Sequence, residues 1–500
     1  MNASERSYRQ ILRSSAIIGG SSIVSVLVVI GKTKIAALWL GPTGVGLIGL
    51  FNGIVGTISA VVGLGIGGAG TRQIAEAAAR GDGETLAAAR RALFWATLSL
   101  ASLGAGLVWL WRAPISMWVS GASTHADDIG WLGIGVALTV ASSAQGAFLN
   151  GMRQIGSLAR INVLGAVGSS ALGITALLAF GLRGVAGFVI AAPLANFLLG
   201  HLFVARLPGM TAKRLPMRKL QQQWVGLARV GIPFMLAGLS TTGAQLFVRA
   251  LVQRELGVEA LGYFQASFTM GTTYLGFVLS AMGTDFYPRL TGAISDRARS
   301  SQLVNEQTEV TLLLAGPAII AVLALAPWLT TLLYSASFAP AVTILRWQVL
   351  GDVLKIASWP LGFILLAAGD GRTYLVCEAI AMGTFALLSF TGVPIIGVEA
   401  TGVAHFAMYA AYLPLVYWLG YRRLGSGWSR RIVALFAVLL LAAGATFMIA
   451  SLSSLAAGFV GCSIAAALAG YALTRISKVS GLSGLLSRLN VKALWEKRNA

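Results

Sequence analysis

Basic side chains inside otherwise apolar runs are the residues of this 500-residue sequence most able to do chemistry. Four of them are singled out: Lys32, Lys34, Arg249 and Lys355. A cation within hydrocarbon costs at least about 2.5–3.5 kcal/mol on insertion scales, so it needs an ionic partner or a water-filled cavity. Ammonium and guanidinium groups also form charge-assisted hydrogen bonds with phosphate oxygens. These residues predict either an anion-binding cavity or internal ion pairs between helices.

Amides and an indole accompany these cations at helical spacing. One stripe consists of Gln245, Arg249 and Gln253, four residues apart and therefore on one helix face. A second stripe consists of Gln348, Asp352, Lys355 and Trp359. Amides suit sugar hydroxyls and an indole suits the face of a sugar ring, so the stripes predict a site for a phosphorylated sugar. Lys32 and Lys34 lie about 200° apart around a regular helix, so such a helix cannot aim both into one cavity.

Two carboxylates in the predicted spans of the second half bear on energy coupling. Asp352 and Glu378 could each carry a coupling proton or form a salt bridge. His405, Tyr409 and Tyr412 share one helix face, which we interpret as hydrogen-bonded packing.

Composition excludes several classes of protein. The chain is 56% hydrophobic and only 11% charged, with a mean hydropathy of +0.78, whereas a soluble chain is about 45–50% apolar and about 25% charged. A soluble enzyme, a disordered chain and a nucleic-acid-binding domain are therefore excluded, despite a net charge of +20. The three histidines are dispersed and the two cysteines lie in apolar runs, so we expect no metal site, no cofactor and no nucleic-acid partner.

The elements that must position the candidate residues are membrane-spanning helices. A span needs about 20 mostly apolar residues, and about fourteen such runs are present. They lie near 11–40, 45–66, 88–110, 128–149, 157–180, 184–205, 226–253, 258–282, 306–333, 341–368, 373–394, 398–420, 431–450 and 454–474. The loops between them are too short for a catalytic domain, and no GxxxxGK[ST] motif is present. The sequence therefore predicts an all-α polytopic transporter rather than an enzyme.

Lysines and arginines set the predicted orientation. With the N-terminus inside, the outside loops hold only Arg112, Arg183 and Arg254, while most of the 37 basic residues lie on the inside. This bias predicts that both termini are cytoplasmic. Arg229 and Arg346 lie near span ends, where we expect them at the membrane interface.

The sequence repeats itself at an offset of about 216 residues. Residues 227–262 align with 11–46, which places Gly257 on Gly41 and Gly262 on Gly46. The repeat predicts two six-helix lobes with one orientation, related by a pseudo-two-fold axis along the membrane normal, plus a C-terminal helix pair. The predicted divisions are 1–208, a linker 209–223, 224–421, the extra pair 422–474 and a basic cytoplasmic tail 475–500. Parallel repeats with a site between them are a transporter architecture that permits alternating access.

The first two predicted spans resemble those of a known family. The stretch from Lys32 to Ala36, the run Leu40-Gly41-Pro42-Thr43-Gly44 and the Gly-Leu-Gly at 63–65 are similar to Wzx-type O-antigen translocases, above all those that flip the enterobacterial common antigen intermediate. These belong to the polysaccharide-transport branch of the MOP superfamily, which also contains the MATE exporters and the MurJ lipid II flippases.

The resemblance implies a function and a location. The substrate would be a polyprenyl-diphosphate-linked oligosaccharide, carried from the cytoplasmic to the periplasmic leaflet of a bacterial inner membrane. A polysaccharide polymerase and the chain-length machinery would be candidate protein partners. Three alternatives stay open: a MATE-type exporter of small cations, a lipid II flippase and a membrane polymerase or ligase. The spans of the first half contain no Asp or Glu beyond Asp128 at the very start of one of them, which disfavours the cation exporter.

Overall fold

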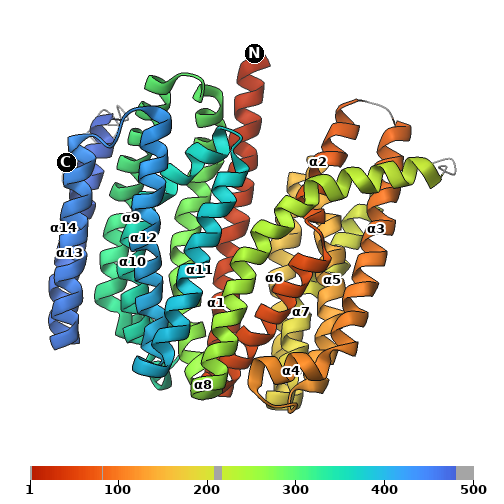
Figure 1. The fold of residues 1–500 in the computed structure, drawn as a ribbon, viewed down its shortest axis with the longest axis horizontal. Coiled ribbons are helices and arrows are strands. Elements are labelled where there is room, and N and C mark those ends of the chain that lie inside the picture. The colour runs from red at the N-terminus through yellow and green to blue at the C-terminus, as the bar shows by residue number, and fades with distance from the viewer. Residues whose placement is uncertain (1–2, 81–82, 208–216, 480–500) are drawn as a thin grey trace, which may run out of the picture. The chain divides into compact units, whose positions relative to one another are not determined.

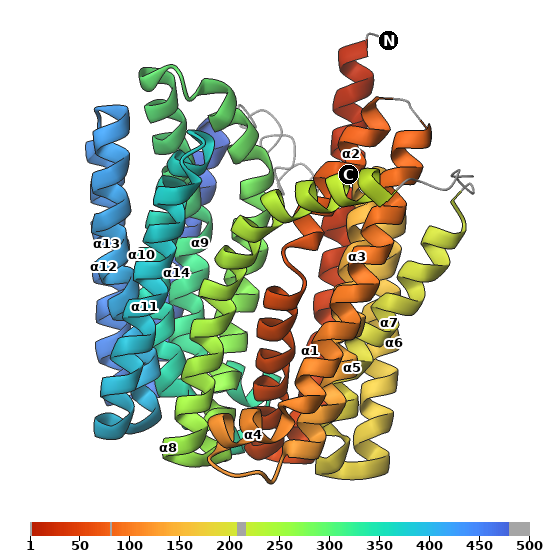
Figure 2. The ribbon, with the colours of Figure 1, turned by 45° about the vertical axis from the view of Figure 1, so that its right-hand side comes forward.

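The computed structural model describes residues 3–80, 83–207 and 217–479, and every regular element in these ranges is helical (Figure 1 and Figure 2). The α-helices are α1 Ala3–Val62, α2 Ile66–Ala79, α3 Gly83–Leu110, α4 Arg112–Ser120, α5 Ala126–Gly151, α6 Ile155–Phe180, α7 Val185–Ala205, α8 Met217–Ala293, α9 Arg297–Leu333, α10 Ala341–Ala367, α11 Gly371–Ile396, α12 Ala400–Leu424, α13 Arg430–Leu452 and α14 Ser454–Val479. Short 3₁₀ helices occupy Gly181–Gly184, Ala336–Phe338 and Gly397–Glu399. The predicted linker 209–223 and basic tail 475–500 lie partly outside the described residues. The all-α prediction is confirmed.

The chain divides into two compact units by its internal contacts. The first unit comprises Met1–Ser267, Thr330–Ile344 and Glu378–Ala404. The second comprises Phe268–Leu329, Leu345–Cys377 and His405–Ala500. Five helices, α8 to α12, therefore contribute to both units. The two predicted lobes were defined by the sequence repeat, whereas these units are defined by contacts. The boundaries of the lobes therefore stay a prediction.

Ten helical stretches in the described part of the chain are long and apolar enough to cross a membrane. Six of them match one predicted span each. The other four, of 43 to 54 residues, each cover two predicted spans: Gly20–Val62, Ile155–Ala205, Gln223–Gly276 and Gly371–Leu424. About 20 residues suffice for one crossing, so each of the four is long enough to cross twice. The polytopic class is confirmed, whereas length and composition alone do not establish fourteen crossings.

Each of the four long stretches contains a glycine in the left-handed region near its middle. Gly41 interrupts α1 at φ 62° and Gly257 interrupts α8 at φ 86°. Gly181 and Gly397, at φ 57° and 69°, open two of the 3₁₀ helices. Glycine adopts such angles readily because it has no Cβ. Each later glycine follows its counterpart by 216 residues, which is the offset of the sequence repeat.

Helix ends recur at the same offset. The helix α5 ends at Gly151 and α6 begins at Ile155, while α10 ends at Ala367 and α11 begins at Gly371. Both later positions lie 216 residues after the earlier ones. These helix ends and the four glycines thus recur at the offset of the repeat found in the sequence.

Asp370 fixes the second of these turns. Its carboxylate accepts a hydrogen bond of 3.2 Å from the backbone N–H of Thr373 and lies 3.5 Å from Nη1 of Arg423. The bonds from Thr373, and then the charge of Arg423, hold the pKa of Asp370 below its usual value. The carboxylate therefore stays ionised at neutral pH and caps the start of α11.

Two glycines that the repeat aligns with each other pack together within the first unit. A Cβ added to Gly46 of α1 would lie 2.4 Å from the carbonyl oxygen of Val258. A Cβ added to Gly262 of α8 would lie 2.0 Å from the carbonyl oxygen of Pro42. The two helices approach so closely that only a hydrogen atom fits between their backbones, as in other contacts between small residues of membrane helices.

The substitution Gly262→Ala is expected to destabilise the protein by about 1–3 kcal/mol or more, because the added methyl meets backbone that cannot turn aside. The measurement is the midpoint of thermal unfolding of the purified protein in detergent. Gly276→Ala in the same helix is the control, since no atom lies within 4 Å of its Cβ. Equal midpoints for the two variants would contradict the close contact.

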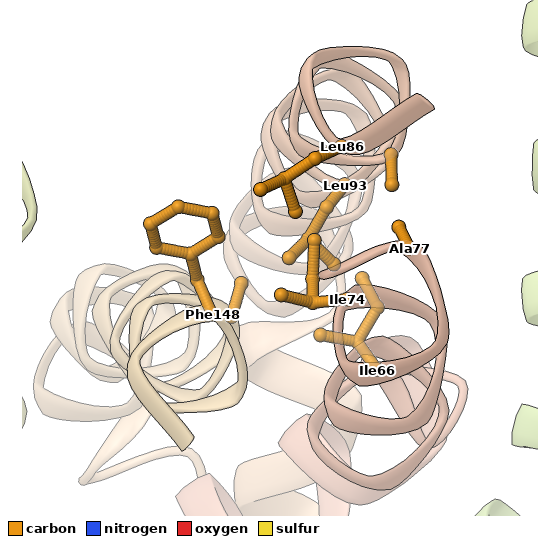
Figure 3. Packing of buried hydrophobic residues seen from close by; sticks show 8 residues of the cluster. Ile66, Ile74, Ala77, Leu86, Leu93 and Phe148 are labelled. Carbon is orange, nitrogen blue, oxygen red and sulfur yellow. The ribbon is translucent and has the colours of Figure 1, made fainter. Parts of the chain in front are cut away.

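The break between α1 and α2 in the first half has no counterpart in the second half. Leu64 and Gly65, at φ 44° and 65°, separate α1 from α2, whereas α8 continues through the equivalent positions 280–281. Buried apolar residues fix α2 against α3 and α5 (Figure 3): Ile66, Ile74, Ala77, Leu86, Ala89, Leu93, Ala144 and Phe148. As a result α2 is a short separate helix with its apolar side buried.

Candidate functional site

Arg249 lies within the first unit in a groove made by glycines. Its side chain is 7% exposed, and its Nε donates a hydrogen bond of 3.0 Å to Oε1 of Gln265. A Cβ at Gly53 of α1 would lie 3.6 Å from Nη1 of Arg249, and one at Gly49 would clash with the side chain of Gln265. The glycines one turn apart on α1 thus leave room for the guanidinium and its amide partner.

The amides predicted beside Arg249 are close to it along α8. Gln245 and Gln253 are both half-buried, one turn before and one turn after Arg249. Oε1 of Gln253 is buried without a hydrogen-bond partner among the described residues. A buried acceptor of this kind can accept a hydrogen bond from a hydroxyl group, such as those of the predicted sugar ligand.

Lys32 also lies in the first unit, beside an aromatic ring. Its Nζ is 4.0 Å from the ring centroid of Phe188 on α7, and a Cβ at Gly173 of α6 would lie 3.3 Å from the same atom. A cation–π contact of this kind stabilises an ammonium group with no carboxylate. The ring of Phe188 is therefore a partner of the Lys32 ammonium group.

Lys34 and Arg346 instead bind the C-terminal ends of helices. Nζ of Lys34 donates to the carbonyl oxygens of Thr331 and Tyr334, where α9 ends. Nη1 of Arg346 donates 2.9 Å to the carbonyl oxygen of Ala450 near the end of α13. The last carbonyls of a helix have no partner within the helix and attract cations. These contacts favour a positioning role for Lys34 and Arg346. The side chains of Lys34 and Lys32 point in different directions, as expected for residues two positions apart on a helix.

A second cluster surrounds Asp352 in the second unit. The carboxylate is 1% exposed and accepts a hydrogen bond of 2.8 Å from the hydroxyl of Tyr274. Nε2 of His405 lies 3.4 Å from Asp352 Oδ1, and Nζ of Lys355 lies 3.8 Å from the same oxygen. Lys355 also lies 5.7 Å from the ring centroid of Tyr409. The cluster joins α8, α10 and α12 and contains three groups that can exchange protons.

The other candidate residues from the second half of the sequence have different surroundings. Gln348, one turn before Asp352, is buried, and its amide nitrogen and oxygen have no hydrogen-bond partner among the described residues. Trp359 packs against the ring of Phe363 at 4.6 Å between centroids and lies close to Gly283. Glu378 is half-buried on α11, in a segment that belongs to the first unit.

Sequence reasoning missed two residues that contact the candidate site, Gln265 and Tyr274. Gln265 follows Arg249 by sixteen residues across the break at Gly257, and nothing in the sequence pairs them. Tyr274 lies 78 residues before Asp352. We interpreted His405 as hydrogen-bonded packing; it is buried, and its Nε2 lies 3.4 Å from Oδ1 of Asp352. His405 and Tyr409 lie one turn apart on the same face of α12, and this spacing is the sequence signal for a polar cluster.

Comparison with known proteins bears on the family and the fold. Residues 37–343 match the model of a family described as polysaccharide biosynthesis protein. The lipid III flippases of Escherichia coli (strain K12) and Shigella flexneri are each 25% identical to the chain over 390 residues, which is 76% of this chain and 91% of each relative.

Solved structures share the fold at lower sequence identity. An inward-facing multidrug resistance MATE family transporter of the MOP superfamily has a TM-score of 0.67 at 17% identity, covering 82% of this chain and 95% of its own. The lipid II flippase MurJ in an inward closed conformation has a TM-score of 0.67 at 12% identity, covering 93% and 99%. The fold is therefore similar to that of both solved structures, the MATE family transporter and MurJ.

Proposed function

Because this chain belongs to the family of polysaccharide biosynthesis proteins, we propose that it moves a lipid-linked oligosaccharide across a bacterial inner membrane. The substrate is a polyprenyl-diphosphate-linked repeat unit of an O-antigen, a common antigen or an exopolysaccharide. The direction is from the cytoplasmic to the periplasmic leaflet. The named relatives are flippases for lipid III, and that substrate class is carried over here as part of the proposal.

The observation that carries the proposal is the environment of Arg249. The guanidinium is buried in a membrane helix, and its Nε donates a hydrogen bond to the neutral amide of Gln265. Lys32 is stabilised by a ring. Cations held in this way attract a diphosphate, whose oxygens accept charge-assisted hydrogen bonds. Small organic cations would be repelled from the same groups.

The architecture that we propose for this transporter has fourteen spans. Each long stretch breaks near its middle and is read as two crossings, giving two six-helix lobes and a C-terminal pair. With both termini cytoplasmic, alternating access moves the diphosphate past Lys32, Arg249 and Lys355, while the amides and Trp359 contact the glycan. Asp352 or Glu378 couples the cycle to an ion gradient. A polysaccharide polymerase and the chain-length machinery then use the product.

The test is a reconstituted transport assay with the full chain. Proteoliposomes carry a polyprenyl-diphosphate oligosaccharide, and a glycan-cleaving enzyme added outside reports the amount that reaches the outer leaflet. We expect cleavage well beyond the fraction accessible in protein-free vesicles. Transport of ethidium but not of the glycan lipid would identify a cation exporter, and transport of lipid II alone would identify a peptidoglycan flippase. Either result would overturn the proposal.

A further inference from the structure

A cavity of about 290 Å³ lies within the first unit, away from the residues proposed to bind the glycan. Its lining residues come from α2, from α3 and from the first part of α8; Figure 2 shows these three helices. Its polar lining includes Arg72, Gln73, Glu76, Arg80, Gln223 and Arg229. The distribution of lysines and arginines predicts that this cavity lies at the cytoplasmic surface of the membrane.

The short helix α2 turns a polar face toward the cavity. Arg72, Glu76 and Arg80 are four residues apart and share one side of this helix. The opposite side carries Ile66 and Ile74, which pack against α3 and α5 (Figure 3). The apolar packing fixes the orientation of α2, so its polar face lines the cavity.

The first turns of α8 form the facing wall. Nε1 of Trp224 donates a hydrogen bond of 3.0 Å to the carbonyl oxygen of Ala92 on α3, and the amide of Gln73 donates to the side chain of Gln223. This wall brings Arg229, some 150 residues away in sequence, to the same cavity as Arg80. The site therefore depends on tertiary structure and not on a run of basic residues.

The cavity has more positive charge than its one carboxylate balances. Nε of Arg72 lies 2.7 Å from Oε1 of Glu76. Within the described part of the chain, no carboxylate pairs with the guanidinium of Arg80 or of Arg229. Oε1 of Gln73 is buried and has no hydrogen-bond partner there. The lining thus offers two cations and one buried acceptor to a ligand.

We propose that this cavity binds the phosphate of an anionic lipid headgroup from the cytoplasmic leaflet. The guanidinium groups of Arg80 and Arg229 bind the phosphate oxygens, and a headgroup hydroxyl donates to Gln73. Basic pockets between helices at the cytoplasmic surface suit such headgroups. A volume near 290 Å³ suits a headgroup but not an oligosaccharide, which distinguishes this site from the transport path.

The repeat provides an internal comparison. The positions 216 residues after Arg72, Glu76 and Arg80 are Pro288, Gly292 and Asp296. The second half therefore lacks this set of side chains, and α8 continues through the positions equivalent to the start of α2. Arginines do occur nearby, at 289, 297 and 299, but at other positions of the repeat.

The experiment measures lipid-dependent stability of the full-length protein in detergent. We expect phosphatidylglycerol to raise the midpoint of thermal unfolding and phosphatidylcholine to leave it unchanged. In the double variant Arg80→Gln/Arg229→Gln the apparent affinity for phosphatidylglycerol falls by about tenfold or more, equal to about 1.4 kcal/mol. Arg289→Gln is the matched control, because Arg289 is exposed, is paired with Asp285 at 3.0 Å and does not line the cavity.

Several outcomes decide the proposal. A double variant that responds to phosphatidylglycerol like the wild type places the lipid elsewhere and overturns it. If inorganic phosphate alone raises the unfolding midpoint equally, the site binds free phosphate rather than a lipid headgroup, and the proposal is wrong. If the double variant does not purify as a monodisperse species, Arg80→Lys/Arg229→Lys retains the charges without the forked donors, and weaker binding is expected for it too. Transport is not measured, so failure here leaves the proposed function untouched.

Discussion

Replacing Arg249 by glutamine is expected to lower transport of the lipid-linked glycan by about a hundredfold or more, because each hydrogen bond to a charged group contributes about 1.5–3 kcal/mol. The substitution removes the charge but keeps an amide that can still bond to Gln265. The groove at Gly49 and Gly53 stays filled. The loss of transport would therefore follow from the missing cation and not from lost packing.

Companion variants separate charge from geometry. Arg249→Glu reverses the charge and should abolish transport, and Arg249→Lys keeps the charge but loses the forked donors, so it should retain part of the activity. Arg254→Gln is the matched control, since Arg254 is exposed five residues further along α8. The readouts are flipping in proteoliposomes, surface polysaccharide in cells and the amount of protein in the membrane. Normal export by Arg249→Gln would rule out the anion-binding cavity.

Much of the fold could be predicted because its determinants are local. Apolar runs of about 20 residues locate the spans, and Gly41 and Gly257 already show the repeat that the helix breaks follow. Arg249 could be singled out because a cation in an apolar run requires an explanation. Its burial agrees with that argument.

Side-chain partners from distant helices could not be predicted. Tyr274 and Asp352 meet only because α8 and α10 pack together, and a single sequence contains no record of that contact. Lys34 and Arg346 illustrate a different difficulty. Both lie in apolar runs like Lys32, yet they bind helix ends whose positions the sequence gives only to within several residues.

Removing the charge of Asp352 is the second change for which we expect a large effect. Asp352→Asn should abolish transport that is driven by a proton gradient, because this carboxylate is the acidic member of the cluster with Lys355 and His405. The single variant also leaves Lys355 buried without its counter-charge, which costs about 3–5 kcal/mol. Loss of function alone would therefore not separate coupling from folding.

The double variant Asp352→Asn/Lys355→Met makes the separation. It removes both charges together, so no buried ion is left unpaired and the thermal stability lost in Asp352→Asn should return. Gradient-driven flipping should stay absent, because the group that takes up the proton is gone. Flipping measured without a gradient reports separately on the loss of Lys355 from the path of the diphosphate. Tyr274→Phe, which removes a single hydrogen bond of 2.8 Å, should retain most transport. Glu378→Gln tests the other candidate carboxyl in the same assay.

The decisive comparison is between stability and transport in that double variant. If the ion pair only holds α10 in place, restoring stability restores flipping, and Asp352 has no part in coupling. If Asp352 carries the proton, stability and transport separate: the double variant unfolds at the wild-type temperature but does not respond to an imposed pH gradient. His405 lies 3.4 Å from the carboxylate, so His405→Gln should then shift the pH dependence of transport without abolishing it.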